Sequence, residues 1–182
     1  MTVTTSAPTR QAVSRGVAMS DRKLDRFLAQ PRSASLAYAR RDGSPFVVPV
    51  WFKWRDGEVL IGTGAADPKV FAIRRNPRVT VLVHDDRAPY GAVIIDGQAS
   101  VEVLGADDQD PTDGIAVHYL GRIGGEVYKQ KMAEVGAFDN GRAIIRIRPD
   151  VIRTNDGSAS LPWATRAFTA LRFRLPIPKR WL

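Results

Sequence analysis

Two Asp-Gly pairs, Asp42-Gly43 and Asp56-Gly57, constrain the fold most, because each separates runs in which apolar and polar residues alternate. Asp-Gly between such runs is the strongest short-range signal of a β-hairpin. The sequence therefore predicts an antiparallel meander of three strands: Ser35–Arg40, Phe46–Trp54 and Glu58–Gly62. In the middle strand, alternation places Val48, Val50 and Phe52 on one face and Val47, Pro49, Trp51 and Lys53 on the other.

The chain continues with short strands and few helices. Helices are predicted from the cap Ser20 to Pro31, with Leu24, Phe27 and Leu28 on one face, and over Pro68–Arg75, before an Asn-Pro pair. Further strands are predicted over Arg78–His84, over Ala92–Val103 with a bulge at Gly97, and over residues 142–155, and two helices within residues 107–137. This pattern predicts a mainly β (α+β) fold, a six-stranded antiparallel split β-barrel with short flanking helices.

The length of 182 residues suits one domain with extensions. Residues 1–19 are polar and lack the apolar segment of a secretory signal, so we expect a disordered lead and a cytoplasmic protein. The barrel domain is predicted over residues 20–156, and a basic amphipathic extension over residues 157–182. No apolar run is long enough to span a membrane.

The composition excludes several kinds of site. The chain has no cysteine and two histidines, which rules out disulfides and thiolate chemistry and argues against a metal site or a Ser-His-Asp triad. The net charge of +8 favours anionic partners in general. The basic residues are scattered along the sequence, and no segment combines them with aromatic residues on which bases could stack. No nucleic-acid partner is therefore expected.

The segment "TGAADPK", residues 63–69, combines a strand end with a helix start. Asp67 stands at the N-cap position and Pro68 at the first helical position, where the missing N–H costs nothing. Lys69 follows in the first turn, where free N–H groups and a full positive charge together attract an anion. This pattern is typical of an anchor for one phosphate group. The alternative is a helix start in which Asp67 caps the helix and Lys69 is solvated.

Four segments carry a family resemblance: "RDGSPFVVPVWF", "EVLIGTG", the lysine followed by "RRNPRVTVLV", and "PYGAVIIDGQASV". Together with the late strand "IIRIRPDVIRT", they resemble the pyridoxamine 5'-phosphate oxidase-like split β-barrel superfamily of flavin- and deazaflavin-binding proteins. The resemblance covers roughly two thirds of the chain. It implies that the coenzyme phosphate binds at Thr63 and Lys69, and that residues 47–52 run along the flavin ring.

The resemblance implies no dedicated catalytic acid or base and no metal, because the coenzyme carries the hydride chemistry. Trp51 and Tyr90 are candidates to lie near the ring or the substrate; the alternative for both is packing within the barrel or against a partner subunit. Tyr38 and Tyr119 are further aromatic candidates. The full set of cofactor-binding residues implied is Val47, Val48, Pro49, Val50, Trp51, Thr63, Gly64, Lys69, Arg75 and Tyr90.

Two departures from the family pattern bear on the coenzyme. True pyridoxamine phosphate oxidases carry Ser-Arg-Lys at the helix start and a Gln before the fifth strand, where this chain has Asp67-Pro68-Lys69 and Ala92. The resemblance therefore favours the subgroup that uses the deazaflavin F420, acting as an oxidoreductase on a small organic acceptor. The alternatives are an FMN-binding oxidoreductase of the same fold and a non-catalytic flavin-, deazaflavin- or tetrapyrrole-binding protein.

Partners follow from the same resemblance. Family members are homodimers with the coenzyme between the two barrels, which implies a homodimer here. In the C-terminal extension, Ala164, Phe168, Leu171 and Leu175 recur at helical spacing among arginines. An extension that packs on the dimer is favoured over a helix that contacts an anionic membrane.

Overall fold

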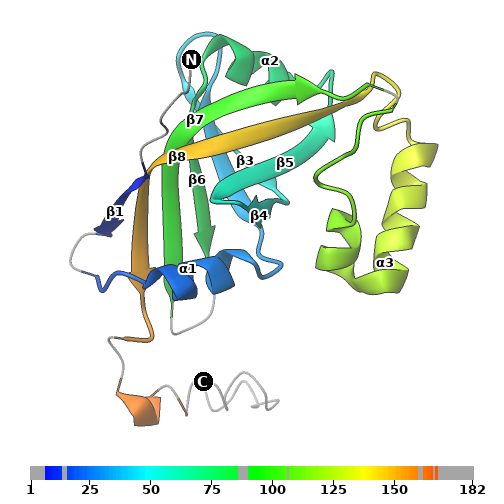
Figure 1. The fold of residues 1–182 in the computed structure, drawn as a ribbon. Helices are drawn as coiled ribbons and strands as arrows, with labels where there is room; N and C mark the ends of the chain where they lie inside the picture. The colour runs from blue at the N-terminus through cyan, green and yellow to red at the C-terminus, as the bar shows by residue number, and fades with distance from the viewer. Residues whose placement is uncertain are drawn as a thin grey trace, which may run out of the picture.

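The structure is a computed structural model that describes residues 7–13, 16–85, 90–105, 107–159, 162–165 and 167. These residues form an eight-stranded sheet in the order β3-β2-β6-β7-β8-β5-β4, with β1 paired to β8. The strands curl around one apolar core, with α1 and α2 at opposite ends of the barrel and α3 to one side (Figure 1). The predicted fold class is confirmed, although two more strands form than the six predicted.

The meander is β2 (Ala34–Ala39), β3 (Pro45–Val50), β4 (Lys53–Arg55) and β5 (Glu58–Gly64). The prediction of one strand over Phe46–Trp54 is wrong, because the chain breaks at Trp51-Phe52. β3 pairs with β2 while β4 pairs with β5, so the break carries the chain between the two ends of the sheet. Phe52 turns into the core there. This crossing splits the predicted strand and adds one to the strand count.

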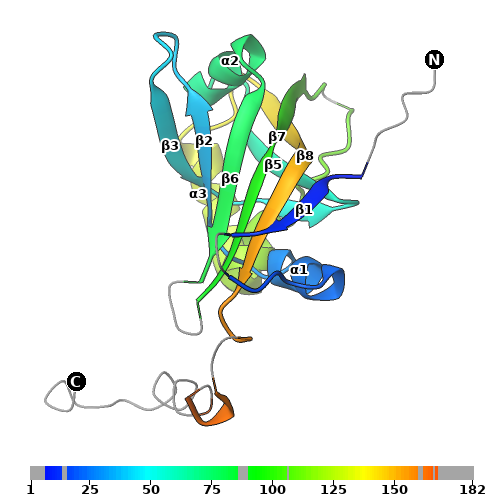
Figure 2. The same ribbon diagram turned by 90° about the vertical axis from the view of Figure 1, so that its left-hand side faces the viewer.

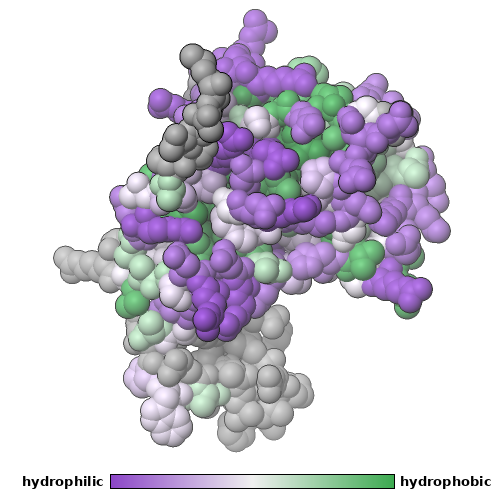
Figure 3. All heavy atoms as spheres, in the orientation of Figure 1, coloured by the Kyte–Doolittle hydropathy of each residue, from purple (hydrophilic) through white to green (hydrophobic). Residues whose placement is uncertain are grey.

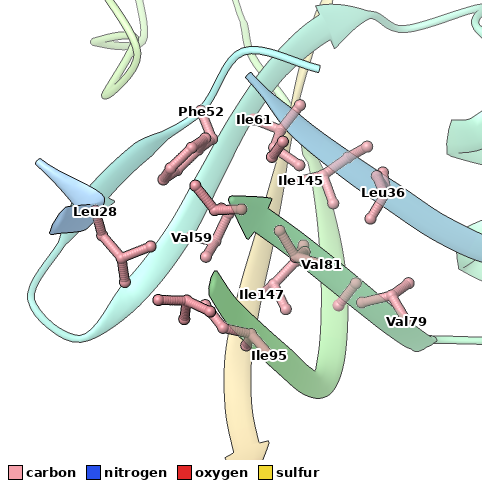
Figure 4. Packing of buried hydrophobic residues seen from close by; sticks show 14 of the residues in the cluster. Leu28, Leu36, Phe52, Val59, Ile61, Val79, Val81, Ile95, Ile145 and Ile147 are labelled. Atoms are coloured by element: carbon pink, nitrogen blue, oxygen red, sulfur yellow. The ribbon is translucent and has the colours of Figure 1, made fainter. Parts of the chain in front are cut away.

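Three long strands form the centre of the sheet: β6 (Arg78–His84), β7 (Gly91–Val103) and β8 (Arg142–Asp156). β7 pairs with β8 along its length, and the register shifts between Asp96 and Gly97, which confirms the predicted bulge. Their inward side chains alternate with outward ones and pack with those of β2 and β5 in Figure 4, where Ile95, Ile145 and Ile147 meet. Burial of this apolar face is the main stabilisation of the barrel.

A strand also forms in the segment that was expected to be a disordered lead. β1 (Thr9–Ala12) pairs in parallel with Val151–Thr154 of β8, as Figure 2 shows. The first half of β8 pairs with β5, and β5 does not extend along its second half. That half therefore offers unpaired backbone groups, which β1 covers. The sequence pattern did not predict this strand because its side chains are mostly polar. Its stability comes from backbone pairing rather than from an apolar face.

The two short helices agree closely with the sequence pattern. In α1 (Asp21–Leu28), Leu24, Phe27 and Leu28 are buried as predicted, and the cap position is Ser20. α2 (Pro68–Arg75) has the predicted bounds, with Asp67 as its N-cap. The carboxylate of Asp67 accepts the backbone N–H of Lys69 at 3.0 Å.

The segment between β7 and β8 holds α3 (Ile115–Glu134), which bends at Gly121 into two helical pieces. Two helices were predicted, and the bend separates them, but the first half of the first predicted helix is a loop. In that loop the carboxylate of Asp110 accepts both the N–H and the hydroxyl of Thr112, at 2.7 and 2.6 Å. Such a side-chain turn competes with helix formation.

Much of the predicted C-terminal extension, including everything from residue 168 onward, lies outside the described residues. In the described part of the chain, none of the helices combines the length and the apolar character needed to cross a membrane.

Candidate functional site

A cavity of about 830 Å³ lies between α3 and the outer wall of the barrel. Its barrel wall is formed by Pro49 and Val50 of β3 and by Ile61 and Gly62 of β5, and Lys69 stands at the start of α2. The other wall is formed by α3 and the segments on either side of it. The residues contributed there are Thr112, Asp113, Gly114, Ile115, Ala116, Tyr128, Lys129, Met132, Ala133, Phe138 and Asp139. The remaining lining residues are Ser33, Trp51 and Arg142.

Trp51 lies at the joint of the two walls. Its ring stacks on Tyr119 with centroids 4.9 Å apart and 16° between the planes, and it meets Tyr128 at 4.9 Å with a tilt of 48°. Both tyrosines come from α3. Aromatic contacts of this kind add stabilisation beyond the buried area. The indole therefore both attaches α3 to the barrel and gives the cavity an aromatic surface.

The hydroxyl of Tyr119 holds α3 to the barrel backbone. It donates to the carbonyl of Arg32 at 2.7 Å and accepts the backbone N–H of Phe52 at 3.2 Å. Burial raises the pKa of Tyr119, so the phenol stays protonated and keeps its donor at neutral pH. One bond satisfies a backbone group at the break between β3 and β4, where the sheet ladder is interrupted, and the other a carbonyl in the segment between α1 and β2.

Lys69, Thr63 and Asp67 meet at the α2 end of the cavity. The Lys69 ammonium donates to Asp67 Oδ2, and the Thr63 hydroxyl donates to the same oxygen at 3.3 Å. Burial alone would raise the pKa of Asp67, but hydrogen bonds from the Lys69 ammonium, the Lys69 N–H and Thr63 hold it below its ordinary value. Asp67 is therefore charged at neutral pH, and its charge compensates that of Lys69.

Arg142, the first residue of β8, supplies a second cation. Its Nη2 lies 2.7 Å from Asp110 Oδ2, an ion pair whose angles fall short of a hydrogen bond, and its guanidinium lies 4.5 Å from the Phe138 ring centroid. Arg142 Nε is buried without an acceptor among the described residues. Gly62 makes room for this corner, because a Cβ there would lie 2.4 Å from the Thr112 hydroxyl. The cavity wall thus contains a cation beside an aromatic ring, with one of its donors buried and unpaired among the described residues.

The model of the pyridoxamine 5'-phosphate oxidase family matches residues 20–156. The chain belongs to this family. No curated protein has a significant sequence match to it.

Solved structures resemble this family member at low identity. A conserved hypothetical protein of Mycobacterium tuberculosis is 24% identical, with a TM-score of 0.62, over 84% of this chain and 94% of that one. An F420 reductase is 24% identical, with a TM-score of 0.50, over 70% and 94% of the two chains. A FAD-binding protein of Mesorhizobium loti is 22% identical, with a TM-score of 0.50, over 74% and 90%. These likenesses support the fold.

The structure brings together some of the residues that the sequence predicted to bind the coenzyme. Pro49, Val50, Trp51 and Lys69 line the cavity. Thr63 is buried behind Lys69, and Gly64 ends β5 beside it. The other predicted residues do not line the cavity: Val48 faces the core, Val47 and Arg75 are exposed, and Tyr90 is 61% exposed at the start of β7.

Tyr90 precedes a strand that starts near α1, at the other end of the barrel from α2 (Figure 1). A second cavity of about 580 Å³ lies there, lined by Arg22, Lys23, Arg26 and Arg32 among others. Lys23 is paired with Asp156 at 2.5 Å, and Arg32 with Asp85 at 2.7 Å. In the described residues, no group of three or more acidic or histidine side chains could hold a metal ion in either place.

The sequence interpretation named Tyr119 as a further aromatic candidate but missed the rest of the α3 wall and Arg142. Periodicity shows which residues of a strand share a face, but it does not show where a helix after a long loop will dock. Tyr119 and Tyr128 carry a usable signal, since two large aromatic side chains on one helical segment need an apolar surface to cover. Arg142, directly after Gly141 at a strand start, gave no comparable signal.

Proposed function

We propose that this protein binds the deazaflavin F420 in the cavity between β3, α2 and α3 and acts as an oxidoreductase that reduces a small organic acceptor. FMN is the alternative coenzyme. The observation that carries the proposal is one cavity, in a pyridoxamine 5'-phosphate oxidase fold, that combines the Trp51 ring with Lys69 and Arg142. The F420 reductase and the FAD-binding protein of similar fold support this class of coenzyme.

The residues present fit an anionic aromatic ligand. A volume of about 830 Å³ lies within the range of small-molecule and cofactor sites. Pro49, Val50 and Trp51 give an apolar surface for a ring system. Arg142 and Lys69 supply two cations to the lining, paired with Asp110 and Asp67. The Arg142 Nε has no acceptor among the described residues, so a ligand acceptor that reached it through a shift of this side chain would be stabilising.

The coenzyme, when bound, supplies the hydride chemistry, and the protein's part is binding, orientation and exclusion of water. Pro49 and Trp51 would orient the ring against β3. Arg142 and Lys69 would attract its negative groups. Tyr128 and Met132 of α3 would shield it from solvent. A cytoplasmic location stays part of this proposal.

Parallel titrations with F420 and FMN, read by coenzyme fluorescence, test the proposal. We expect saturable binding of F420 that Trp51→Ala weakens by about tenfold, because an aromatic contact is lost. Trp54→Ala is the control, since Trp54 packs against the core and donates to Asp25 at 2.8 Å, away from the cavity lining. Binding of neither coenzyme would contradict the proposal. Binding without reduction of any acceptor would leave a carrier protein instead.

The proposal includes a homodimer. α3 exposes Leu120 before its bend and Ile123 and Val127, one helical turn apart, after it, by 45%, 83% and 60%, and apolar side chains interrupt the polar surface in this region (Figure 3). A second copy would remove this surface from water. Light scattering should give twice the chain mass, and Ile123→Glu with Val127→Glu should lower it to one. A monomeric wild type would contradict this part.

A further inference from the structure

At the α2 end of the cavity, one carboxylate occupies the donors that an anion would use. Asp67 Oδ1 accepts the Lys69 backbone N–H at 3.0 Å, and Oδ2 accepts the Lys69 ammonium and the Thr63 hydroxyl, the latter at 3.3 Å. A helix N–H, a lysine and a strand-end hydroxyl are the usual partners of a phosphate group. Here these three donors already bind the Asp67 carboxylate, which is negatively charged, as a phosphate would be.

This arrangement is partly withdrawn from water, which strengthens its effect. The Lys69 side chain is only 14% exposed and that of Asp67 33%. A ligand phosphate placed beside Lys69 would therefore either displace Asp67 or lie next to its negative charge. Repulsion between unit charges a few ångströms apart is substantial in such surroundings, and it grows with the charge of the phosphate.

We propose that Asp67 is a specificity-determining residue, an internal occupant of the anion site that discriminates against coenzymes with a terminal phosphate monoester. Such a group carries nearly two negative charges at pH 7. A phosphodiester, as in F420, carries one. Because Asp67 occupies Lys69, it disfavours a coenzyme that would place a phosphate monoester beside this lysine more than one that would place a phosphodiester there. The inference rests on the proposed function in that a coenzyme occupies this cavity.

The affinities of FMN and riboflavin measure this effect directly, because the two share a ring and differ by one phosphate monoester. In the wild-type protein the phosphate should add little, so the two dissociation constants should lie within a few-fold of each other. In Asp67→Asn the FMN affinity should rise by roughly tenfold to a hundredfold while that of riboflavin stays the same, as expected for freed charge-assisted hydrogen bonds. Asn caps helices as well as Asp, so α2 should persist.

Two further variants control the experiment. Lys69→Gln added to Asp67→Asn should abolish the gain, because the freed ammonium is lost. Asp56→Asn makes the same charge change at the turn before β5, at the opposite end of that strand from Thr63, where the Asp56 carboxylate is 86% exposed and pairs only with its neighbour Arg55 at 3.3 Å among the described residues; it should change neither dissociation constant. Asp67→Ser, another good cap, replaces Asp67→Asn if that variant does not fold.

Inorganic phosphate separates failure of this inference from failure of the proposed function. Phosphate should raise the melting temperature of Asp67→Asn more than that of the wild type, whether or not a flavin binds. Such a gain without flavin binding by any variant would support the anion site and contradict the coenzyme proposal. Flavin binding with an unchanged ratio of FMN to riboflavin, or a wild type that already strongly prefers FMN, would overturn the inference.

Discussion

The two walls of the cavity are built in different ways. The barrel wall belongs to a sheet whose inward residues, such as Ile61 and Ile145, are 1% and 0% exposed. The α3 wall buries only Ala116 and Gly125 of its own helix. Among the described residues it is attached to the barrel mainly by the rings around Trp51, by the Tyr119 hydroxyl and by a hydrogen bond from Lys53 to the Asp113 carbonyl. The cavity therefore has one rigid wall and one that can open at much lower cost.

This difference assigns separate tasks to the two walls. The barrel can hold Pro49, Trp51 and Lys69 in fixed positions, because Pro49 lies in β3, Trp51 directly follows it and Lys69 lies in α2. The α3 wall can admit a ligand without disturbing the barrel, because local opening needs few contacts to break. A site for a large coenzyme needs both properties.

The largest expected effect lies in the barrel wall. Ile145→Ala should lower the free energy of unfolding by about 2–4 kcal/mol, because it leaves a cavity in a fully buried cluster. Val135→Ala, at a 58% exposed position that ends α3 and lies outside the proposed dimer surface, is the control and should change it by less than about 0.5 kcal/mol. Urea unfolding measures both. Equal losses for the two variants would remove the distinction between the walls.

The bend of α3 offers the next effect. Gly121 has φ 72° and ψ 173°, a region that side chains other than glycine's avoid. Gly121→Ala should therefore destabilise the bend by about 1–3 kcal/mol. Hydrogen exchange should accelerate in residues 115–134 and stay unchanged in β7. Acceleration in both regions would show that the two walls unfold as one unit.

A smaller effect concerns the attachment of α3. Tyr119→Phe removes the hydrogen bonds to Arg32 and Phe52 and should free α3 by about 1 kcal/mol, again read by hydrogen exchange. Tyr128→Phe is the control, because within the described residues the Tyr128 hydroxyl makes no hydrogen bond to the barrel and only its ring contacts Trp51. Both variants keep their rings, so an equal acceleration in the control would show that the Tyr119 hydrogen bonds are not what holds α3, and no acceleration in Tyr119→Phe would leave the ring contacts as its attachment.

The smallest effect is a pH dependence confined to the barrel wall. Burial would raise the pKa of Glu58, but hydrogen bonds from Arg146 and Arg148, at 2.7 and 3.0 Å, hold it below the ordinary 4.5. A lowered folded-state pKa means that this stabilisation is present above pH 4.5 and is lost as the pH falls through the lowered value. Glu58→Gln should flatten the acid limb of the stability curve. Glu134→Gln, at an exposed pair on α3, should leave it unchanged.

The same contrast explains what the sequence could predict. Alternation and Asp-Gly turns are local signals, so β6 and α2 have their predicted bounds, and β2, β5, β7 and β8 agree to within about two residues. The break at Trp51-Phe52 and the strand β1 depend on which edges the rest of the sheet leaves free, which no local pattern encodes.

The site divides in the same way. Lys69 and its neighbours are given by a strand end and a helix start that adjoin in the sequence, so they could be predicted. The Lys69 ammonium and the Thr63 hydroxyl both donate to Asp67 Oδ2. This could not be predicted, because it depends on the geometry of the side chains and not on residue type alone. Arg142 and the α3 residues lie far along the chain and reach the cavity only through tertiary packing.

The central claim is that the cavity between the two walls is the coenzyme site. A crystal structure of the protein with F420 bound tests it most directly. We predict coenzyme density in contact with Pro49, Trp51 and Arg142, beneath α3. Density confined to the second cavity beside α1, with the first one filled by solvent, would contradict the account.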